Sequence, residues 1–187
     1  MKNDIQNAVK TLREGGVILY PTDTVWGLGC DPTNPEAVQK IYDIKKRDDR
    51  KSMLLIVDAD FRIASYINEI PDIAFELIEV SEKPLTIIYP GAKNLSENLV
   101  AEDGSIGIRV SSDRFCQDLV RKFGKPIVST SANISGAPAP AIFPEISEEI
   151  LGQADYVVNW RQDDLSSAVP SSIIKLDDKG HFQIIRK

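Results

Sequence analysis

A short basic segment stands out in a chain that is acidic overall. Residues 45–51 read Lys-Lys-Arg-Asp-Asp-Arg-Lys, which places five cations and two anions in seven residues, whereas the formal net charge of the chain is −6. The segment follows a helical pattern and precedes the apolar run from Met53 to Val57, so we expect a loop between a helix and a strand. Such loops often hold ligands, and we interpret this one as a phosphate clamp. The alternative is a solvated charge run that favours solubility.

Small hydroxyl and amide side chains follow two of the apolar runs. Thr22, Asp23 and Thr24 come after the run 17–20, and residues 129–136 read Ser-Thr-Ser-Ala-Asn-Ile-Ser-Gly after a second run. In open α/β sheets, ligands gather beyond the carboxyl ends of the strands, which makes both stretches candidate ligand sites. Each could also be a turn whose side chains satisfy the local backbone.

A third candidate is an arginine inside a predicted strand. Residues 105–110 read Ser-Ile-Gly-Ile-Arg-Val, so the two-residue period of a strand places Ser105, Gly107 and Arg109 on one face. An arginine between small residues is expected to face open space. The alternative is an arginine on an edge strand whose stem lies along apolar surface while its head reaches water.

The remaining inventory excludes several kinds of chemistry. The single histidine, His181, offers no ready catalytic triad or histidine metal site. Cys30 and Cys116 form no Cys-x-x-Cys pattern and are expected in the core. The Gly27-Leu28-Gly29 fragment has Pro32 where a dinucleotide-binding fingerprint needs its third glycine, and no P-loop motif occurs. Cations with hydroxyls suit reactions at phosphate, where catalysis is mostly positioning and charge neutralisation.

Composition indicates one ordinary globular domain. The chain has 187 residues, of which 42% are hydrophobic and 27% charged. We therefore expect a single domain over residues 1–187. The acidic balance argues against a protein whose main role is broad nucleic-acid binding, because that role leaves a basic footprint. No apolar run is long enough for a membrane span or a signal peptide, and we expect a cytoplasmic protein.

The spacing of apolar residues predicts alternating helices and strands, and thus an α/β fold. Asp58 is expected to cap a helix over residues 61–67, and Ser112 to cap a helix over residues 115–123. The predicted helices cover residues 5–12, 35–42, 61–67, 73–78, 115–123 and 145–151. The predicted strands cover residues 17–20, 53–57, 85–89, 105–110, 126–129 and 156–158, with a closing pair at 170–176 and 182–186.

Seven motifs in order resemble those of the YrdC-like family, and the resemblance runs nearly end to end. They are Gly16 to Gly29, Lys45-x-Arg47, Lys83-Pro84-Leu85-Thr86, Gly107 to Val110, Ser129 to Gly136, Pro170 to Ile173 and Ile184-Ile185-Arg186. The resemblance implies a single-domain twisted mixed open sheet with helices packed on it. The chain looks like the short form of the family.

The resemblance also implies an activity. Members of the family include L-threonylcarbamoyladenylate synthases, which form threonylcarbamoyl-AMP and pyrophosphate from L-threonine, bicarbonate and ATP. Their product serves the threonylcarbamoyladenosine modification at position 37 of tRNA, through downstream threonylcarbamoyl transferase proteins. Magnesium is expected to arrive with the ATP, and no metal site of the protein's own is expected.

Carried over residue by residue, the resemblance assigns two half-sites. Lys45 and Arg47 would carry the catalytic charge neutralisation at the triphosphate. The ATP half comprises Lys45, Arg47, Lys51, Ser105, Ser131, Asn133 and Arg186. The threonine half comprises Thr24, Arg109, Ser129 and Ser171. The chain departs from the family at Lys46, where glycine is frequent, and at Ile56, where some members carry a threonine-binding histidine.

Two rival functions follow from the same resemblance. One is a module that binds structured, double-stranded RNA or tRNA without synthase activity, which the basic segment favours and the net charge opposes. The other is a YciO-like relative with the same fold and a different activity. The presence of both Lys-x-Arg and Ser-x-Asn argues against that second rival. No membrane partner is expected.

Overall fold

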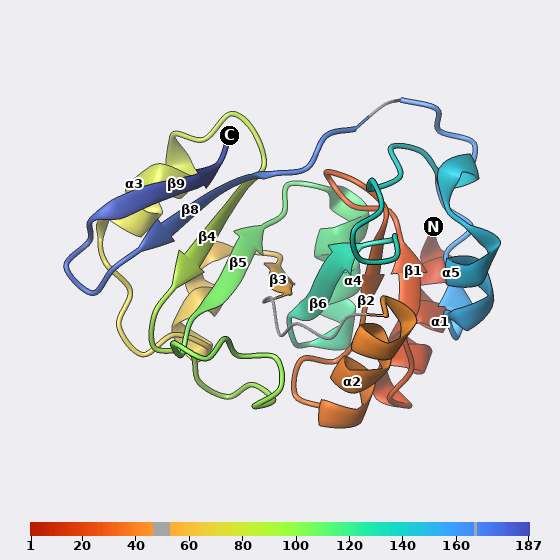
Figure 1. Cartoon of the computed structure of the whole chain (residues 1–187), viewed down its shortest axis with the longest axis horizontal. Coiled ribbons are helices and arrows are strands. Elements are labelled where there is room, and N and C mark those ends of the chain that lie inside the picture. Colours follow the sequence, from red (N-terminus) through yellow and green to blue (C-terminus); the bar gives the residue numbers. More distant parts are fainter. Residues whose placement is uncertain (47–52, 167) are drawn as a thin grey trace.

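The fold is one continuous mixed sheet with helices packed around it (Figure 1). The computed structural model describes residues 1–46, 53–166 and 168–187. In these residues the strands are β1 (Ile18–Tyr20), β2 (Gly27–Gly29), β3 (Leu54–Val57), β4 (Leu85–Tyr89), β5 (Ile106–Val110), β6 (Ile127–Ser131), β7 (Tyr156–Val157), β8 (Ser172–Leu176) and β9 (Phe182–Arg186). The helices are α1 (Lys2–Arg13), α2 (Pro35–Ile44), α3 (Ile73–Glu79), α4 (Arg114–Phe123) and α5 (Glu148–Gln153), with 3₁₀ turns η1 (Asp60–Ser65) and η2 (Phe143–Glu145).

The strand order is β7-β1-β2-β6-β3-β5-β4-β8-β9. The pairs β1/β7, β3/β5 and β4/β8 are parallel, whereas the other neighbouring pairs are antiparallel. The predicted α/β fold with a mixed sheet is therefore confirmed. The order also brings distant segments together, because β6 lies between β2 and β3 and β8 lies beside β4. No helix in the described part of the chain is long and apolar enough to span a membrane.

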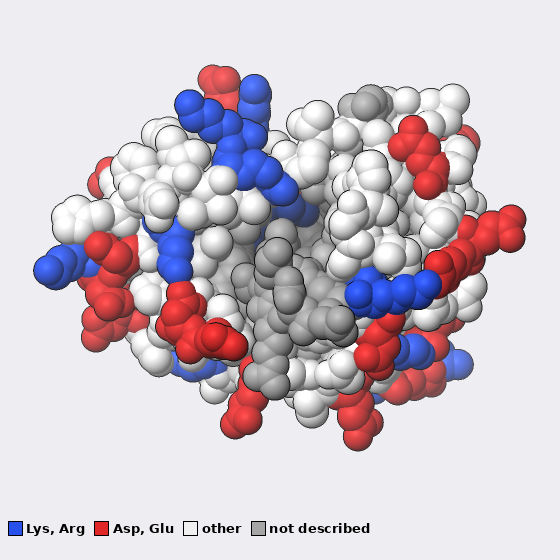
Figure 2. All heavy atoms as spheres, in the orientation of Figure 1, with Lys and Arg blue, Asp and Glu red and all other residues white. Residues whose placement is uncertain are grey.

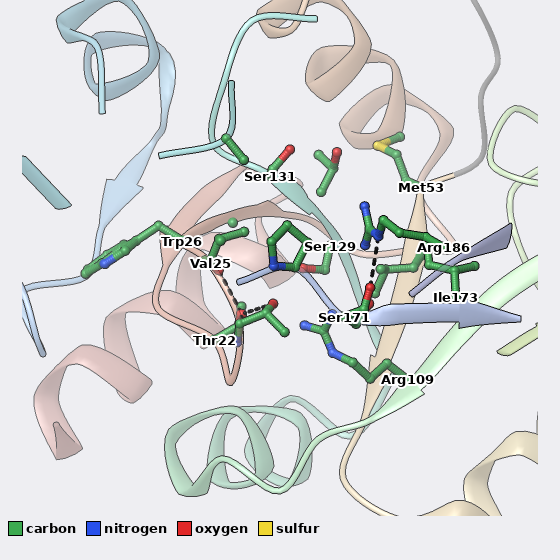
Figure 3. Close-up of a pocket in the computed structure, with 16 residues that line it drawn as sticks. Thr22, Val25, Trp26, Met53, Arg109, Ser129, Ser131, Ser171, Ile173 and Arg186 are labelled. Atoms are coloured by element: carbon green, nitrogen blue, oxygen red, sulfur yellow. Dashed lines mark hydrogen bonds between the residues drawn. The ribbon is translucent and has the colours of Figure 1, made fainter. Parts of the chain in front are cut away.

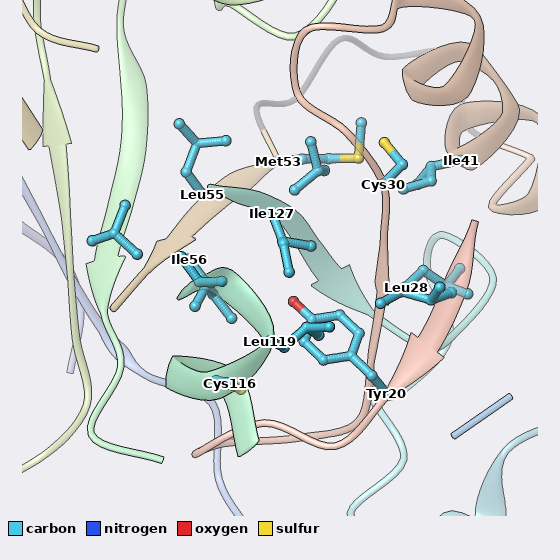
Figure 4. Close-up of a cluster of buried hydrophobic side chains, with 14 of the residues drawn as sticks. Tyr20, Leu28, Cys30, Ile41, Met53, Leu55, Ile56, Cys116, Leu119 and Ile127 are labelled. Carbon is cyan, nitrogen blue, oxygen red and sulfur yellow. The ribbon is translucent and has the colours of Figure 1, made fainter. Parts of the chain in front are cut away.

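Helices α1 and α4 pack against each other over the sheet. Both bury the faces that the apolar periodicity predicts, including Leu12 of α1 and Leu119 of α4. Figure 4 shows part of this core, where Leu119 lies beside Tyr20 of β1 and Ile127 of β6. Burying one large apolar side chain stabilises a fold by about 1.5 to 3 kcal/mol, so this layer holds the β1, β2 and β6 end of the sheet in place.

Two predicted helix caps are wrong. The cap of α4 is Asp113, whose Oδ1 accepts a hydrogen bond from the Cys116 amide at 2.9 Å. Ser112 is not the cap, because the first residue of the helix is Arg114 and the residue directly before it is Asp113. Asp58 is likewise occupied: its carboxylate pairs with Arg62 and accepts a hydrogen bond from Arg121 Nε. The chain that follows it forms the 3₁₀ turn η1 and not the predicted α-helix.

Strand β2 was not predicted, because Gly-Leu-Gly is a poor strand sequence by propensity. The structure explains the glycines. A Cβ atom on Gly29 would lie 2.7 Å from Tyr20 Cε1 and 2.7 Å from the Val128 carbonyl oxygen, which is too close for any side chain. Glycine therefore lets β2 fit between β1 and β6.

Two further boundaries differ from the predictions. Strand β6 continues to Ser131, beyond the predicted end at Ser129, so Thr130 and Ser131 belong to the strand and not to the loop after it. The predicted helix 145–151 is divided into η2 and α5, because Ser147 accepts a hydrogen bond from the Ile150 amide and caps a new helix.

We expect the Asp113→Ala variant to lower the free energy of unfolding by about 1 to 2 kcal/mol, because the cap of α4 is lost. Asp113→Asn should keep most of this free energy, since asparagine caps helices about as well as aspartate. Ser112→Ala is the matched control and should stay within about 0.5 kcal/mol of the parent protein. Urea unfolding monitored by circular dichroism measures all three. Equal losses from Ser112→Ala and Asp113→Ala would contradict the assignment of the cap.

Candidate functional site

A cavity of about 190 Å³ lies where β2, β5, β6, β8 and β9 approach one another (Figure 3). Its polar lining consists mainly of hydroxyl groups and two guanidinium groups, and its apolar lining comes from Val25, Trp26, Met53 and Leu54 among others. The described lining residues are Thr22, Thr24, Val25, Trp26, Gly27, Met53, Leu54, Arg109, Ser129, Thr130, Ser131, Ala139, Pro170, Ser171, Ile173 and Arg186. This lining contains no carboxylate side chain.

Most of the described residues that the sequence assigned to ligands meet at this cavity. All four residues of the predicted threonine half line it, together with two residues of the predicted ATP half; these are Thr24, Arg109, Ser129, Ser171, Ser131 and Arg186. Lys45, Ser105 and Asn133 are not among the lining residues. Arg47 and Lys51 lie outside the residues that the structure describes, so the predicted phosphate clamp remains a prediction there.

The turn between β1 and β2 forms one wall of the cavity. Thr22 Oγ1 donates a hydrogen bond to the Val25 carbonyl oxygen at 2.8 Å and accepts one from the Thr24 amide at 3.0 Å. The two threonine hydroxyls lie 3.0 Å apart. Both interpretations of this stretch therefore hold, because the side chains satisfy their own backbone and also face a cavity. The hydrogen bonds fix the Thr24 hydroxyl before any ligand arrives.

Arg109 places a buried positive charge at the cavity. The residue is only 3% exposed, and its Nη2 lies 3.0 Å from Asp23 Oδ1. Strand β5 is flanked by β3 and β4, so the edge-strand alternative for this arginine is wrong. The Nε atom of Arg109 is buried and has no hydrogen-bond partner among the described residues. Because a buried unpaired donor costs free energy, this guanidinium is suited to accept an additional anion.

Ser171 is held in place at the cavity by contacts with Thr86 and Arg186. Its Oγ lies 2.8 Å from Thr86 Oγ1, and its carbonyl oxygen accepts a hydrogen bond from Arg186 Nε at 2.9 Å. Burial, and then the nearby positive charge of Arg109, lower the pKa of the Arg186 guanidinium. Two cations thus face one cavity whose described lining has no carboxylate. An anionic ligand is the natural complement.

Lys45 lies just behind the cavity wall and joins α2 to the segment after β6. The residue is 3% exposed, and its Nζ donates hydrogen bonds to the carbonyl oxygens of Ser131 at 2.6 Å and Asn133 at 2.7 Å. The Asn133 amide group donates to the carbonyl oxygens of Ile134 and Ala137, whereas its Oδ1 is buried without a hydrogen-bond partner among the described residues. This part of the predicted ATP half is therefore pre-arranged beside Ser131.

Ser105 directly precedes β5 and does not line the cavity. Its hydroxyl donates to Asp103 Oδ1 at 2.6 Å, and Asp103 Oδ2 lies 2.5 Å from Lys175 Nζ. The hydrogen bond from Lys175, and then that from Ser105, lower the pKa of Asp103 to about 2. In this arrangement the Ser105 hydroxyl is already used, and its predicted role at ATP stays a prediction.

Two contacts of the site were not predicted from the sequence. Asp23 was a candidate ligand-binding residue, but its pairing with Arg109 was not predicted; Thr86 belongs to one of the family-like motifs, but its hydrogen bond with Ser171 was not predicted. Both act through contacts between residues far apart in the chain, which periodicity and local motifs do not report. Ile56, where some family members carry histidine, is 1% exposed in the hydrophobic core and is not a lining residue (Figure 4).

Positive and negative side chains are distributed unevenly on the surface. Figure 2 shows Lys and Arg side chains at the rim of a hollow on this face, while acidic side chains gather toward the lower and outer edges. Among the described residues, no group of three or more His, Cys, Asp or Glu side chains is placed to hold a metal ion. The hydrogen-bond donors at the cavity are guanidinium and hydroxyl groups, which suit the anionic part of a ligand.

Comparisons with known proteins support a common origin for this arrangement. The Sua5/YciO/YrdC family model, described as "Telomere recombination", matches residues 10–187. A protein of Vibrio campbellii named threonylcarbamoyl-AMP synthase is 39% identical over 155 residues, which is 81% of this chain and 83% of that protein. A protein of Pseudoalteromonas translucida with the same name is 35% identical over 161 residues, or 84% of this chain and 86% of that protein.

Solved structures share the fold. Escherichia coli YciO is 27% identical with a TM-score of 0.84, and the match covers 100% of this chain and 90% of YciO. Sua5 of P. abyssi in complex with L-threonine is 24% identical with a TM-score of 0.82 over 92% of this chain. The match covers 50% of that Sua5 chain, so the present chain spans about half its length. With the family model matched over nearly the whole sequence, the chain belongs to the Sua5/YciO/YrdC family.

Proposed function

We propose that the chain is a threonylcarbamoyl-AMP synthase, which joins L-threonine, bicarbonate and ATP into threonylcarbamoyl-AMP and releases pyrophosphate. One observation carries this proposal: a buried arginine with an unpartnered Nε faces a small cavity lined by hydroxyl groups. The names of the relatives that match over four fifths of the chain support the same function. The product would be passed to threonylcarbamoyl transferase proteins that modify tRNA.

Threonine fits the described part of the cavity by size and by chemistry. The volume of about 190 Å³ is below the roughly 300 Å³ at which pockets for drug-sized ligands begin, and a single amino acid is correspondingly small. Arg109 would bind the carboxylate, because a guanidinium presents paired donors to a carboxylate. The hydroxyls of Thr24, Ser129 and Ser171 would surround the polar groups of the amino acid. A site that hydrogen-bonds a buried substrate hydroxyl strongly rejects analogues that lack it.

ATP would lie beside the threonine, along Ser131 and Arg186. Lys45 and Asn133 would support this half from behind, since both contact the segment that carries Ser131. The predicted contacts of Arg47 and Lys51 would complete it. Magnesium would arrive with the nucleotide and be held by its phosphate groups, because the described lining of the cavity contains no carboxylate. Bound in this way, the metal would offset phosphate charge.

The chain's own residues would act mainly by positioning and charge neutralisation. Threonine and bicarbonate form N-carboxythreonine with loss of water, and an oxygen of its new N-carboxylate group forms a bond to the α-phosphorus of ATP. The bond from that phosphorus to the bridging oxygen of the β-phosphate breaks, and pyrophosphate leaves with the electron pair. Arg109 and Arg186 would hold the two anions together against their mutual repulsion. A preformed cavity does this without reorganising at the moment of reaction.

A structured-RNA-binding module without synthase activity is less well supported. Only the basic segment 45–51 favours it, and the net charge of −6 opposes it. Direct contact of this protein with tRNA would belong to a later step, in which the product is used. A YciO-like activity is separated from synthase activity by the first experiment below.

Pyrophosphate release from ATP should require both L-threonine and bicarbonate and should proceed without tRNA, because the cavity is built for small anionic molecules. The measurement is a coupled pyrophosphate assay with each component omitted in turn. Serine in place of threonine is the matched control for recognition of the side chain. Equal release in the absence of threonine would contradict the proposed function.

Replacing Arg109 should weaken threonine binding selectively. Arg109→Ala removes hydrogen bonds to a charged group, which are worth about 1.5 to 3 kcal/mol each, and should leave affinity for a non-hydrolysable ATP analogue nearly unchanged. Arg109→Lys keeps the charge that pairs with Asp23 and should show an intermediate loss, because lysine cannot bind a carboxylate in the same bidentate way.

Calorimetric titration with each ligand measures these affinities, and Arg114→Ala on the exposed face of α4 is the control. From the sequence, Arg47→Ala should show the reverse pattern. Loss of nucleotide binding with unchanged threonine affinity in Arg109→Ala would mean that the two halves of the site are assigned the wrong way round.

Chelation of magnesium with excess EDTA should stop pyrophosphate release, since the metal would neutralise the triphosphate, and added MgCl₂ should restore it. Threonine affinity measured without nucleotide should not change, because the proposed threonine half uses Arg109 and hydroxyl groups. A fall in threonine affinity on chelation would mean that the metal contributes to the threonine half of the site, which would contradict its proposed place with the nucleotide.

A further inference from the structure

Thr86 is the second residue of β4 and its side chain is buried. It is 2% exposed, and it is not among the residues that line the cavity. In the register of β4 with β5 it stands opposite Arg109. Its hydroxyl lies 2.8 Å from the hydroxyl of Ser171, which is also 2% exposed but does line the cavity. Thr86 therefore reaches the cavity only through another side chain.

The hydroxyl is not needed for packing. A Cβ atom on Gly107 would lie 3.3 Å from the Thr86 methyl carbon, which shows that the methyl group fills the space over β5. A valine would fill that space equally well and is favoured in strands. Burying a hydroxyl group instead costs free energy unless it is hydrogen-bonded. The contact with Ser171 is what distinguishes threonine from valine at this position.

The backbone of Ser171 is held independently. Its carbonyl oxygen accepts from Arg186 Nε, and the next amide, of Ser172, donates to the Pro84 carbonyl oxygen at 3.0 Å. The remaining freedom at Ser171 is the direction of its O–H bond. A hydroxyl has one proton to donate and two lone pairs. If Thr86 donates to Ser171, the Ser171 proton is left for the cavity; if Ser171 donates, the cavity meets only lone pairs.

The charges around Ser171 favour one of these directions. Arg109 and Arg186 also line the cavity, so the ligand end that binds here is an anion, and an anion needs donors. Figure 3 shows the Ser171 side chain and the Arg109 guanidinium directed toward the same part of the cavity. We propose that Thr86 is a positioning residue: it donates its proton to Ser171 Oγ and thereby aims the Ser171 proton at the carboxylate of the bound amino acid. This inference rests on the proposed function.

The test compares Thr86→Val, which removes the hydroxyl and keeps the shape, with Thr86→Ser, which keeps the hydroxyl. Thr86→Val should raise the KM for threonine about 3- to 10-fold, the scale of one hydrogen bond, with kcat and the KM for ATP changed less than about 2-fold. Thr86→Ser should restore the KM for threonine to near the parent value. Ser96→Ala is the control, because it removes a buried hydroxyl that contacts Asn98 and does not line the cavity.

A double-mutant cycle separates positioning from general loosening of the site. In a Ser171→Ala background, Thr86→Val should have no further effect on the KM for threonine. Additive losses in the double mutant, equal increases in both KM values, or failure of Thr86→Ser to restore threonine binding would overturn the inference. If the parent protein shows no threonine-dependent pyrophosphate release, the proposed function itself fails and this inference fails with it. If the parent shows that release and Thr86→Val has parent kinetics, this inference alone is wrong.

Discussion

The buried pair of Arg109 and Asp23 constrains much of the site. A guanidinium in the interior of a sheet is tolerated only with a counter-charge, since removing one partner of a buried pair leaves an uncompensated charge. Asp23 supplies that charge from the turn between β1 and β2, so the pair ties this turn to the central strand β5. Asp23 lines two neighbouring cavities but not the one with Arg109, and it therefore approaches the guanidinium from behind. The face of Arg109 toward the cavity is left for a ligand.

The order of the strands brings the other residues of the site next to the Arg109–Asp23 pair. Strand β6 lies between β2 and β3, which brings its serines beside the turn that holds Thr22 and Thr24. At the other side, the parallel pair β4/β8 and the final strand β9 bring Ser171 and Arg186 against Arg109. The cavity is thus assembled from segments throughout the chain, and each segment contributes one or two polar groups. Most of these groups already have a partner that fixes their direction.

Residue types at strand ends were enough to predict much of this site. Thr24, Arg109 and Ser129 are short-range inferences from strand periodicity and from the resemblance, and the structure brings them together. The pairing of Asp23 with Arg109 and of Thr86 with Ser171 depends on which strands are neighbours, which local patterns do not encode. The caps failed for a related reason. Ser112 and Asp58 are good caps by type, but Asp113 stands one residue nearer the start of α4, and two arginines hold Asp58.

The position of Ser129 and Ser131 on one strand also sets a distance. Successive residues of a strand rise by about 3.3 Å, so two positions on the same face are about 6.6 Å apart. In the proposed assignment, Ser129 faces threonine and Ser131 faces the nucleotide, which makes β6 a fixed spacer between the threonine-derived nucleophile and the phosphorus it attacks. The antiparallel neighbours of β6 on both sides hold its register. A shift of that register by one residue would turn both hydroxyls to the opposite face of the sheet. The spacing between the two substrates would then no longer be set by β6.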